Sequence, residues 1–577
     1  MKKTIFAVTI LLLFSLTCCE KEDKTNTLTV STHQIAIPEE GGNAVFSIAT
    51  NAASWEIDNP APEWLTLPAV AGIKQEITIS LNVTSKTLEP RTATLTIKAG
   101  NAKPLQITVT QAASAYLYSI TANTDKLDFA KSGNETLLQI STDAPGWALH
   151  ASADWIQTSS TTGEKGTSTV NVTAPENSDA KRTAILTITA EHAPSIEIKI
   201  SQDGNRYPNY NTSPVEPDAT GMTGTATELA SKIKVGWNIG NTLEAIGGET
   251  AWGNPMVTDE LIKLVKQNGF NAIRIPCAWN QYMENNTTAK IRASWLNRVK
   301  QVVQYCVDND MYVILNIHWD GGWLENNCTP EKKDENNDKQ RAFWEQIATH
   351  LRDFDERLIF AGTNEPNVEN ASQMAVLQSY LQTFVDAVRS TGGRNSYRVL
   401  AVQGPSTDIE KTDKLMGTLP TNVVPNRMMV EIHYYTPYQF CLMTEDASWG
   451  KMFYYWGKDY HSTTQTNRNA TWGEETQLNE LMALMKTKFV DKGIPVIMGE
   501  YAVIRRTSLT GDALSLHLAS RAHYLKYLTK QAKAHGILPF YWDAGNMGNN
   551  ASALFDRKNN TAYDPQALNA IIEGANE

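Results

Sequence analysis

The sequence predicts three folded domains, two β-sandwiches followed by an α/β barrel of the (β/α)8 type. A chain of 577 residues is too long for one ordinary domain. Its first third repeats a pattern in which polar and apolar residues alternate, which is typical of half-buried strands. From about Met222 onward, short apolar runs alternate with amphipathic stretches, which is typical of parallel strands connected by helices.

The amino terminus is typical of an export signal. Lys2-Lys3 precedes an apolar run from Ile5 to Leu16 that is too short to span a membrane. We therefore expect residues 1–19 to be a signal peptide and residues 20–26 to be a polar tether.

The end of the signal, Leu16-Thr17-Cys18-Cys19, resembles a bacterial lipobox. Glu20-Lys21-Glu22-Asp23 resembles the acidic tag that follows the lipidated cysteine in surface lipoproteins of Bacteroidetes. The resemblance implies a lipid on Cys19, with Cys18 as the alternative site, and an outer-membrane lipoprotein at the cell surface. Ordinary secretion with an unmodified cysteine is the other alternative.

Two repeats follow, at residues 27–113 and 119–204. Their matching parts are Pro90–Ile97 with Ala180–Ile188, Ile107–Gln111 with Ile198–Gln202, and Trp55 and Trp64 with Trp147 and Trp155. Many short alternating strands separated by turns predict a β-sandwich for each repeat.

The repeats resemble the BACON domain, an immunoglobulin-like module of Bacteroidetes whose name implies carbohydrate binding. Trp64 and Trp155 are candidates for such binding, but they alternate with polar neighbours and fit a sandwich core as well. We favour a spacer role for both repeats. Residues 205–219, rich in Asn, Pro and Ser, are expected to be a linker to the barrel at residues 220–577.

Eight apolar runs in the third domain predict barrel strands, and amphipathic stretches between them predict helices. The expected strands are Lys234–Trp237, Ala272–Ile275, Tyr312–Asn316, Leu358–Ala361, Val399–Ala401, Met428–Ile432, Val496–Gly499 and Leu538–Tyr541. The expected helices are Asp259–Asn268, Ser294–Asn309, Arg341–Arg352, Ser372–Ser390, Glu474–Lys488 and Ser515–Ala534. Gly236–Asn241 lacks the G-x-G-x-x-G pattern of a doubly wound dinucleotide-binding sheet.

Polar or aromatic residues stand at the ends of most of these strands. They are Arg274, His318, Asn364, Glu365, His433, Tyr435, Glu500 and Trp542. The carboxyl ends of barrel strands meet at one face, where barrel enzymes have their active sites. Two glutamates on that face, Glu365 and Glu500, are the groups needed to cleave a glycosidic bond.

The stretch from Gly236 to the carboxyl terminus resembles glycoside hydrolase family 5. The motifs that carry the resemblance are Gly236–Glu244, Arg274-Ile275-Pro276, Asn364-Glu365-Pro366, His433-Tyr434-Tyr435 and Gly499-Glu500-Tyr501. Glu249–Pro255 and Phe440–Met443 further resemble subfamily 4, which implies an endo-β-1,4-glucanase or xyloglucanase built on a TIM barrel.

The resemblance implies that Glu365 is the general acid/base and Glu500 the nucleophile of a reaction that retains the anomeric configuration. Arg274 and Tyr435 are expected to keep Glu500 ionised. Glu365 is expected to hold its proton until it meets the leaving oxygen. Asn364 is expected to contact the 2-hydroxyl of the sugar that is cleaved.

The resemblance also implies residues that position or bind the substrate. They are His318 and His433 as supporting groups, and Asn241, Trp252, Gln403 and Trp542 as substrate contacts. The indole of Trp542 is expected to form the floor on which the sugar stacks.

The expected substrate is a β-1,4-glucan of the plant cell wall, either xyloglucan or a cellulose-type or mixed-linkage glucan. A β-mannan is the alternative substrate in the same family, and a non-catalytic surface glycan-binding protein is the alternative class. The formal net charge of −11 argues against a nucleic-acid partner. We expect no cofactor and a monomeric protein.

One spacing resembles a calcium-binding loop. Asp334, Asn336, Asp338 and Glu345 fall at ligand positions of an EF-hand, but Lys339 stands where the tight turn needs glycine. We therefore expect a solvated loop and no metal site.

Four cysteines lie beyond the signal, namely Cys277, Cys306, Cys328 and Cys441. Cys277 and Cys306 lie in apolar patterns and are expected to be buried and unpaired. The sequence leaves the pairing of the other two open.

Overall fold

The structure is a computed structural model that describes residues 25–73 and 76–577. The predicted signal peptide and the predicted lipidation site, Cys19, lie outside the described residues. The chain divides into two compact units. The first contains the described residues up to Glu176 together with Arg182–Asp203, and the second contains Asn177–Lys181 and Gly204–Glu577.

The first repeat is a sandwich of two sheets with the strand orders β1-β3-β7-β5 and β2-β9-β8-β4-β6. Strand β8 shows why the sequence folds this way, because Leu95 and Ile97 are buried and the threonines between them are not. The strands are β1 Leu28–Val30, β2 Gln34–Ile37, β3 Gly42–Thr50, β4 Trp55–Asp58, β5 Leu65–Thr66, β6 Ala71–Gly72, β7 Glu76–Val83, β8 Arg91–Ala99 and β9 Leu105–Gln111.

The second repeat has the same pairing pattern, with one long strand in place of β3 and β4. The first part of β12 pairs with β10 and β14, and its last part pairs with β15 after a register shift between Thr142 and Gly146. The strands are β10 Ile120–Ala122, β11 Lys126–Phe129, β12 Asn134–Ala151, β13 Gln157–Thr158, β14 Thr162–Ala174, β15 Arg182–Ala190 and β16 Ile196–Gln202. Both predicted sandwiches are confirmed.

An arginine covers the same tryptophan in each sandwich. The Arg91 guanidinium lies 4.5 Å from the Trp64 ring centroid, and that of Arg182 lies 4.2 Å from the ring of Trp155. Such cation–π contacts occupy the face that a sugar would need. Trp64 lies in the core of its sandwich and Trp155 packs against the core of the other, which favours the predicted spacer role.

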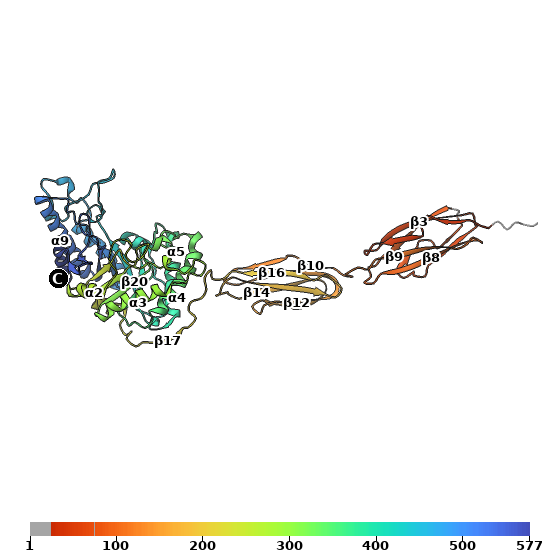
Figure 1. Ribbon diagram of the computed structural model, residues 1–577, viewed down its shortest axis with the longest axis horizontal. Coiled ribbons are helices and arrows are strands. Elements are labelled where there is room, and N and C mark those ends of the chain that lie inside the picture. The colour runs from red at the N-terminus through yellow and green to blue at the C-terminus, as the bar shows by residue number, and fades with distance from the viewer. Residues whose placement is uncertain (1–24, 74–75) are drawn as a thin grey trace, which may run out of the picture. The chain divides into compact units, whose positions relative to one another are not determined.

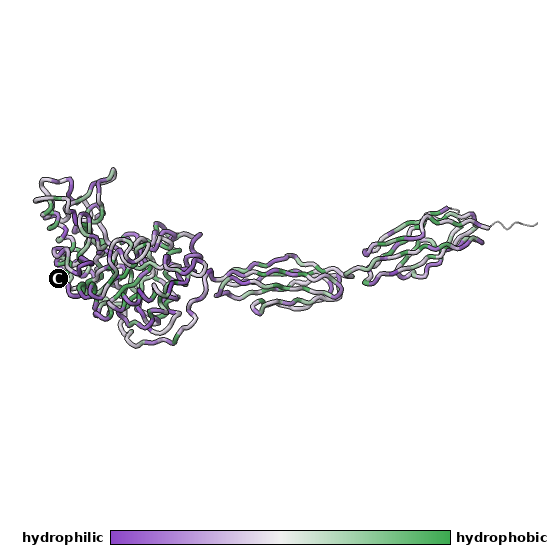
Figure 2. Tube along the Cα trace, viewed as in Figure 1, coloured by the Kyte–Doolittle hydropathy of each residue, from purple (hydrophilic) through white to green (hydrophobic). Residues whose placement is uncertain are grey.

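The second unit contains the predicted barrel, in which eight parallel strands close in the order β18-β19-β20-β21-β23-β24-β25-β26. Figure 1 shows helices α3, α4 and α5 around strand β20, and Figure 2 shows apolar segments within the same part of the chain. The strands are β18 Gly236–Ile239, β19 Ala272–Ile275, β20 Tyr312–Asn316, β21 Leu358–Ala361, β23 Leu400–Gln403, β24 Met428–Tyr434, β25 Val496–Tyr501 and β26 Ile537–Asp543.

Helices follow most of the strands, and their apolar faces cover the barrel. The helices are α1 Ala226–Lys232, α2 Asp259–Gln267, α3 Ala293–Asp308, α4 Lys333–His350, α5 Ala371–Ser390, α6 Ile409–Leu415, α7 Tyr438–Cys441, α8 Glu475–Lys488, α9 Gly511–Ala534 and α10 Pro565–Asn576. The six predicted helices are present, and α1, α6, α7 and α10 are additional.

The loop predicted around Asp334 and Asp338 is wrong. Helix α4 begins at Lys333, so this stretch is helical and does not have the turn of a calcium-binding loop. Asn336 is buried and donates to the carbonyl of Trp323 at 3.1 Å, and Glu345 pairs with Arg341 at 2.9 Å. These side chains stabilise the packing of the helix.

The predicted linker at residues 205–219 is part of the second unit. Its strand β17, Val215–Pro217, pairs in parallel with β22, Gly392–Gly393. A polar composition favoured a free linker, but the chain here is held by backbone hydrogen bonds that composition does not reveal.

Two further findings concern the described residues. Cys277, Cys306, Cys328 and Cys441 are all buried and unpaired, which confirms the prediction for the first two. No helix in the described ranges combines the length and the apolar character needed to cross a membrane.

Candidate active site

The closed barrel brings the polar strand ends together. Their positions are Arg274 on β19, His318 after β20, Asn364 and Glu365 after β21, His433 on β24, Tyr435 after β24, Glu500 on β25 and Trp542 on β26. Each of these residues makes a hydrogen bond, an ion pair or a ring contact with another of them. The strand-end pattern therefore predicted a real cluster.

Arg274 is the fully buried centre of the site. Its guanidinium donates to Glu500 Oε1 at 2.8 Å, to Asn364 Oδ1 at 2.9 Å and to Asn238 Oδ1 at 3.0 Å. Its Nε lies 2.8 Å from Glu431 Oε1. One arginine therefore compensates two buried carboxylates, each of which would be costly to bury alone.

Glu500 lies deep in the site, with 7% of its side chain exposed. Tyr435 donates to Glu500 Oε2 at 3.0 Å, and His318 Nε2 lies 4.0 Å from Oε1. Gly499 precedes it on β25, where a Cβ atom would collide with the Glu431 carboxylate. A glycine is therefore required beside Glu500.

Glu365 is much more accessible, with 40% of its side chain exposed. Its Oε1 lies 2.6 Å from His433 Nδ1. One oxygen of Glu365 and one of Glu500 lie within 4.8 Å of each other. That separation fits direct attack by one carboxylate, whereas a mechanism with a water between the two needs roughly 6.5 Å or more.

His433 carries a proton at neutral pH. Burial alone would lower its pKa, but the charges of Glu500, Glu365 and Glu431 raise the pKa to about 10. Burial would raise the pKa of Glu365, but the hydrogen bond and charge of His433, and to a smaller extent the charge of Arg274, hold that pKa below its usual value. Burial raises the pKa of Glu500, against the opposing effect of His433 and Arg274.

This order of pKa values is the reverse of the prediction, in which Glu500 was the more acidic group. Two contacts explain the difference. Arg274 divides its charge between Glu500 and Glu431, and the imidazolium of His433 lies against Glu365. The His433–Glu365 pair nevertheless holds one proton, and their hydrogen bond is a path for that proton to reach the carboxyl group.

Glu365, His433 and Glu500 are also close enough to be considered as a metal site. The atoms that would bind a metal already form hydrogen bonds, His433 with Glu365 and Glu500 with Arg274. The charge of Arg274 neutralises part of the negative charge of the cluster. A further cation would meet repulsion from Arg274 and His433, so the cluster suits proton transfer better.

His318 and Trp542 form a stacked pair, with ring centroids 5.6 Å apart and planes inclined by 7°. Burial, followed by Arg274, holds the pKa of His318 well below its usual value, so the imidazole is neutral. The side-chain amide nitrogen of Asn316 lies 3.2 Å from His318 Nδ1 and donates a hydrogen bond to it. Nε2 therefore carries the hydrogen that faces Glu500.

Gln403 does not line the site, contrary to the prediction of a substrate contact. It is fully buried, and its amide donates to Glu431 Oε2 at 2.6 Å and accepts from the Thr363 backbone nitrogen at 2.8 Å. Its hydrogen bonds connect Glu431 on β24 to Thr363 after β21 and so stabilise these strand ends. Asn241 is half-buried with φ of 58°, and Trp252 is nearly half exposed, so both are accessible to a ligand and remain predicted contacts.

The prediction missed two carboxylates. Glu431 lies on β24 in the run Met428–Tyr434, where a charged residue within a buried strand was a signal for a partner such as Arg274. Glu325 lies in the loop between β20 and α4 and accepts a hydrogen bond from the backbone nitrogen of Glu365 at 3.1 Å. No spacing or strand end pointed to Glu325.

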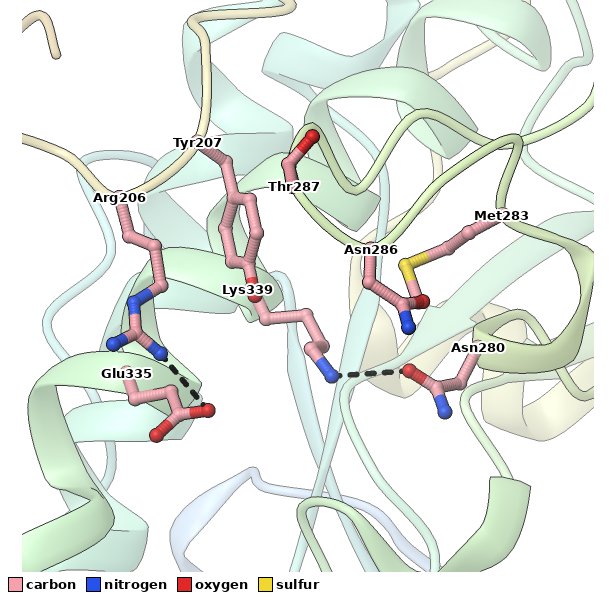
Figure 3. Close-up of a pocket in the computed structure, with 8 residues that line it drawn as sticks. All are labelled: Arg206, Tyr207, Asn280, Met283, Asn286, Thr287, Glu335 and Lys339. Atoms are coloured by element: carbon pink, nitrogen blue, oxygen red, sulfur yellow. Dashed lines mark hydrogen bonds and ion pairs between the residues drawn. The ribbon is translucent and has the colours of Figure 1, made fainter.

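A separate cavity of about 550 Å³ shares no residue with this cluster. Figure 3 shows Lys339 directed toward Asn280 and Arg206 toward Glu335 across it. Arg206 and Glu335 pair with each other and Lys339 donates to Asn280, so the cluster around Arg274 is the stronger candidate for chemistry.

The comparisons with known families agree with the division of the chain. Residues 237–548 match the cellulase family, glycosyl hydrolase family 5. Residues 53–112 and 146–203 match the BACON family, described as a putative N-terminal binding domain. Each matched range lies within one of the domains that the sequence predicted.

Individual proteins are similar over most of the chain. A xyloglucan-specific endo-β-1,4-glucanase of Bacteroides ovatus is 37% identical over 78% of this chain and 90% of its own length. The solved Bacteroides ovatus GH5 xyloglucanase, in complex with a XXXG heptasaccharide, is similar with a TM-score of 0.60 and 35% identity, over 79% of this chain and 100% of that one. A family 5 xyloglucanase from Paenibacillus pabuli is similar with a TM-score of 0.56 and 38% identity, over 60% of this chain and 99% of that one.

Proposed function

Because the chain belongs to glycosyl hydrolase family 5, we propose that it is an endo-β-1,4-glucanase that acts on xyloglucan and retains the anomeric configuration. The observation that carries the proposal is the pair of carboxylates within 4.8 Å, which follow or end the fourth and seventh barrel strands. Two carboxylates at this spacing can act in succession on the same anomeric carbon.

In the first step, Glu500 attacks the anomeric carbon and forms an ester while the glycosidic bond breaks. Glu365 gives its proton to the departing oxygen, so the leaving sugar departs as an alcohol. In the free protein that proton is shared with His433, at 2.6 Å from Glu365. We assign His433 the task of supplying the proton to Glu365 as the glycosidic oxygen arrives.

In the second step, Glu365 takes a proton from water, and the water oxygen attacks the anomeric carbon and releases Glu500. The ester no longer carries the charge of Glu500, which is the strongest cause of the raised pKa of His433. Both the histidine and Glu365 therefore hold protons less tightly at the stage when a base is needed.

The remaining residues orient the reacting groups. Arg274 and Tyr435 each donate to Glu500 and aim its two oxygens. Asn364 accepts a hydrogen bond from Arg274 at 2.9 Å, and we assign it the role of binding the 2-hydroxyl of the sugar. Trp542, fixed by stacking on His318, is assigned the sugar face.

Similarity to xyloglucanases over most of the chain favours xyloglucan as the substrate. Cellulose-type and mixed-linkage glucans share its backbone and are the next candidates. A β-mannan differs at the 2-hydroxyl, which is the group assigned to Asn364.

The first prediction is that the wild-type protein releases reducing sugar faster from xyloglucan than from carboxymethylcellulose or glucomannan, with an early fall in viscosity that marks endo action. The Glu500→Ala variant is the matched control for the same polymers. Release from mannan alone would show that the substrate is wrong, and no release from any of these polymers would show that the enzyme proposal is wrong.

We further propose that the protein works outside the cell as a surface lipoprotein anchored through Cys19. The lipobox-like sequence supports the proposal. So do the BACON domains of this chain and its similarity to a Bacteroides xyloglucanase. A polymer too large to enter the cell must be cut outside it, so an exported enzyme fits this substrate.

The second prediction tests the spacer role of the sandwiches. Deleting residues 27–204 is expected to leave kcat and KM on soluble xyloglucan within about twofold, because the barrel has its own hydrophobic core and Trp64 and Trp155 are covered by arginines. Initial rates of both proteins on one polymer preparation are the measurement. A rise in KM of tenfold or more would show that the sandwiches bind the substrate.

A further inference from the structure

Glu325 lies in the loop between β20 and α4 and holds the segment that carries Glu365. Its Oε2 accepts a hydrogen bond from the backbone nitrogen of Glu365 at 3.1 Å and from the side-chain amide of Asn364 at 3.3 Å. Its own backbone carbonyl accepts from the nitrogen of Asn367 at 2.8 Å. One residue therefore holds Asn364, Glu365 and Asn367 of the loop after β21.

The carboxylate of Glu325 has no cation as a partner. Among residues 25–73 and 76–577, no ion pair joins it to a lysine, an arginine or a histidine. The ionisable groups that face it are Glu365 from the β21 loop, Glu500 from β25 and the Cys328 thiol from its own loop. A charge on Glu325 is thus felt by the two reacting carboxyl groups, and Arg274 reaches Glu325 only through the side chain of Asn364.

We propose that Glu325 is a positioning residue that holds Asn364 and Glu365 in place and, when it is ionised, keeps the proton on the Glu365–His433 pair. This inference rests on the proposed function, in which Glu365 is the acid of the first step. Glu325 acts through Glu365 and does not itself touch the reacting atoms.

The charge on Glu325 changes close to neutral pH. Burial raises its pKa to about 7, and the charges of Glu365 and Glu500 add to this effect, while the amide of Glu365 opposes it. Below this pH Glu325 is neutral. Above it, the new negative charge raises the pKa of the Glu365–His433 pair, so the acid retains its proton to a higher pH.

The third prediction concerns Glu325→Gln, which keeps the shape and an acceptor oxygen but never ionises. Near pH 5, where Glu325 is neutral in the wild type, kcat and KM should match the wild type within about twofold. Above pH 7 the activity should fall earlier, with the alkaline limb of kcat/KM moved to lower pH by about one unit. The measurement is the profile of kcat/KM between pH 5 and 9 on xyloglucan.

Two variants complete the experiment. Glu331→Gln removes an exposed carboxylate a few residues further along the chain and should leave the profile unchanged. Glu325→Ala also removes the two hydrogen bonds of the side chain and should lower kcat about tenfold at every pH, with a melting temperature close to that of the wild type.

The outcomes distinguish this inference from the proposed function. An active wild type whose alkaline limb is unchanged by Glu325→Gln, or is moved equally by Glu331→Gln, overturns the inference alone. An inactive wild type overturns the proposed function. A shift confined to Glu325→Gln supports both.

Discussion

Replacing Glu500 with alanine is expected to lower the rate of xyloglucan hydrolysis by about 10⁴-fold or more, because the first step then has no nucleophile. The fold should survive. Arg274, which loses one partner, keeps the ion pair with Glu431 at 2.8 Å, so the buried guanidinium is not left without a counter-charge. The measurement is the initial rate, with circular dichroism to confirm that the variant is folded.

Azide should restore turnover of an activated aryl glycoside by Glu500→Ala, and the configuration of the product reports which face of the sugar is attacked. In Glu500→Ala, azide enters the space left by the side chain and displaces an activated aryl leaving group with a single inversion, which gives the α-glycosyl azide. The Glu228→Ala variant, which changes an exposed residue on α1, is the matched control with full activity. A β-glycosyl azide from Glu500→Ala would contradict the assignment of the nucleophile.

Replacing Glu365 with alanine is expected to produce a loss that depends on the leaving group. Hydrolysis of the polysaccharide, whose leaving sugar needs a proton, should fall by about 10² to 10⁴-fold. An aryl β-cellobioside with an acidic phenol needs no such proton and should still form the ester on Glu500, which then accumulates because the base of the second step is absent. The measurement is the burst of phenol equal to the enzyme concentration.

Azide distinguishes this variant from the previous one. Here the ester has formed, so the anion attacks from the side of Glu365 and the product is the β-glycosyl azide, after two inversions. Glu365→Gln serves as the matched variant because it keeps the contact with His433. Equal losses on polysaccharide and activated substrate, with no burst, would show that Glu365 is not the acid.

Much of the barrel could be predicted because buried parallel strands read as apolar runs. Ala272–Ile275, Tyr312–Asn316 and Leu358–Ala361 were predicted at their observed bounds. The start of α4 was not, because its first residues are polar and show no apolar periodicity until Ala342. The helix is stabilised there by tertiary contacts such as the one between Asn336 and Trp323.

The site was predictable where it depends on strand ends and unpredictable where it depends on side-chain direction. Glu365 and Glu500 follow from the strand-end pattern and the family motifs. The role of Glu431 depends on its side chain pointing from β24 toward Arg274. The role of Glu325 depends on the conformation of a loop without regular structure. The order of the pKa values of Glu365 and Glu500 depends on burial and on the contacts of Arg274 and His433, which the sequence alone does not reveal.

The unequal exposure of the two glutamates determines which molecules can complete the reaction. Glu500 is closed off, whereas Glu365 is open to the solvent. Anything that intercepts the ester must therefore approach past Glu365, and a sugar hydroxyl that takes this approach meets the same base as water does. At high oligosaccharide concentration the two acceptors compete, so the product mixture gains chains that are longer than the substrate, and the hydrolase becomes in part a transferase.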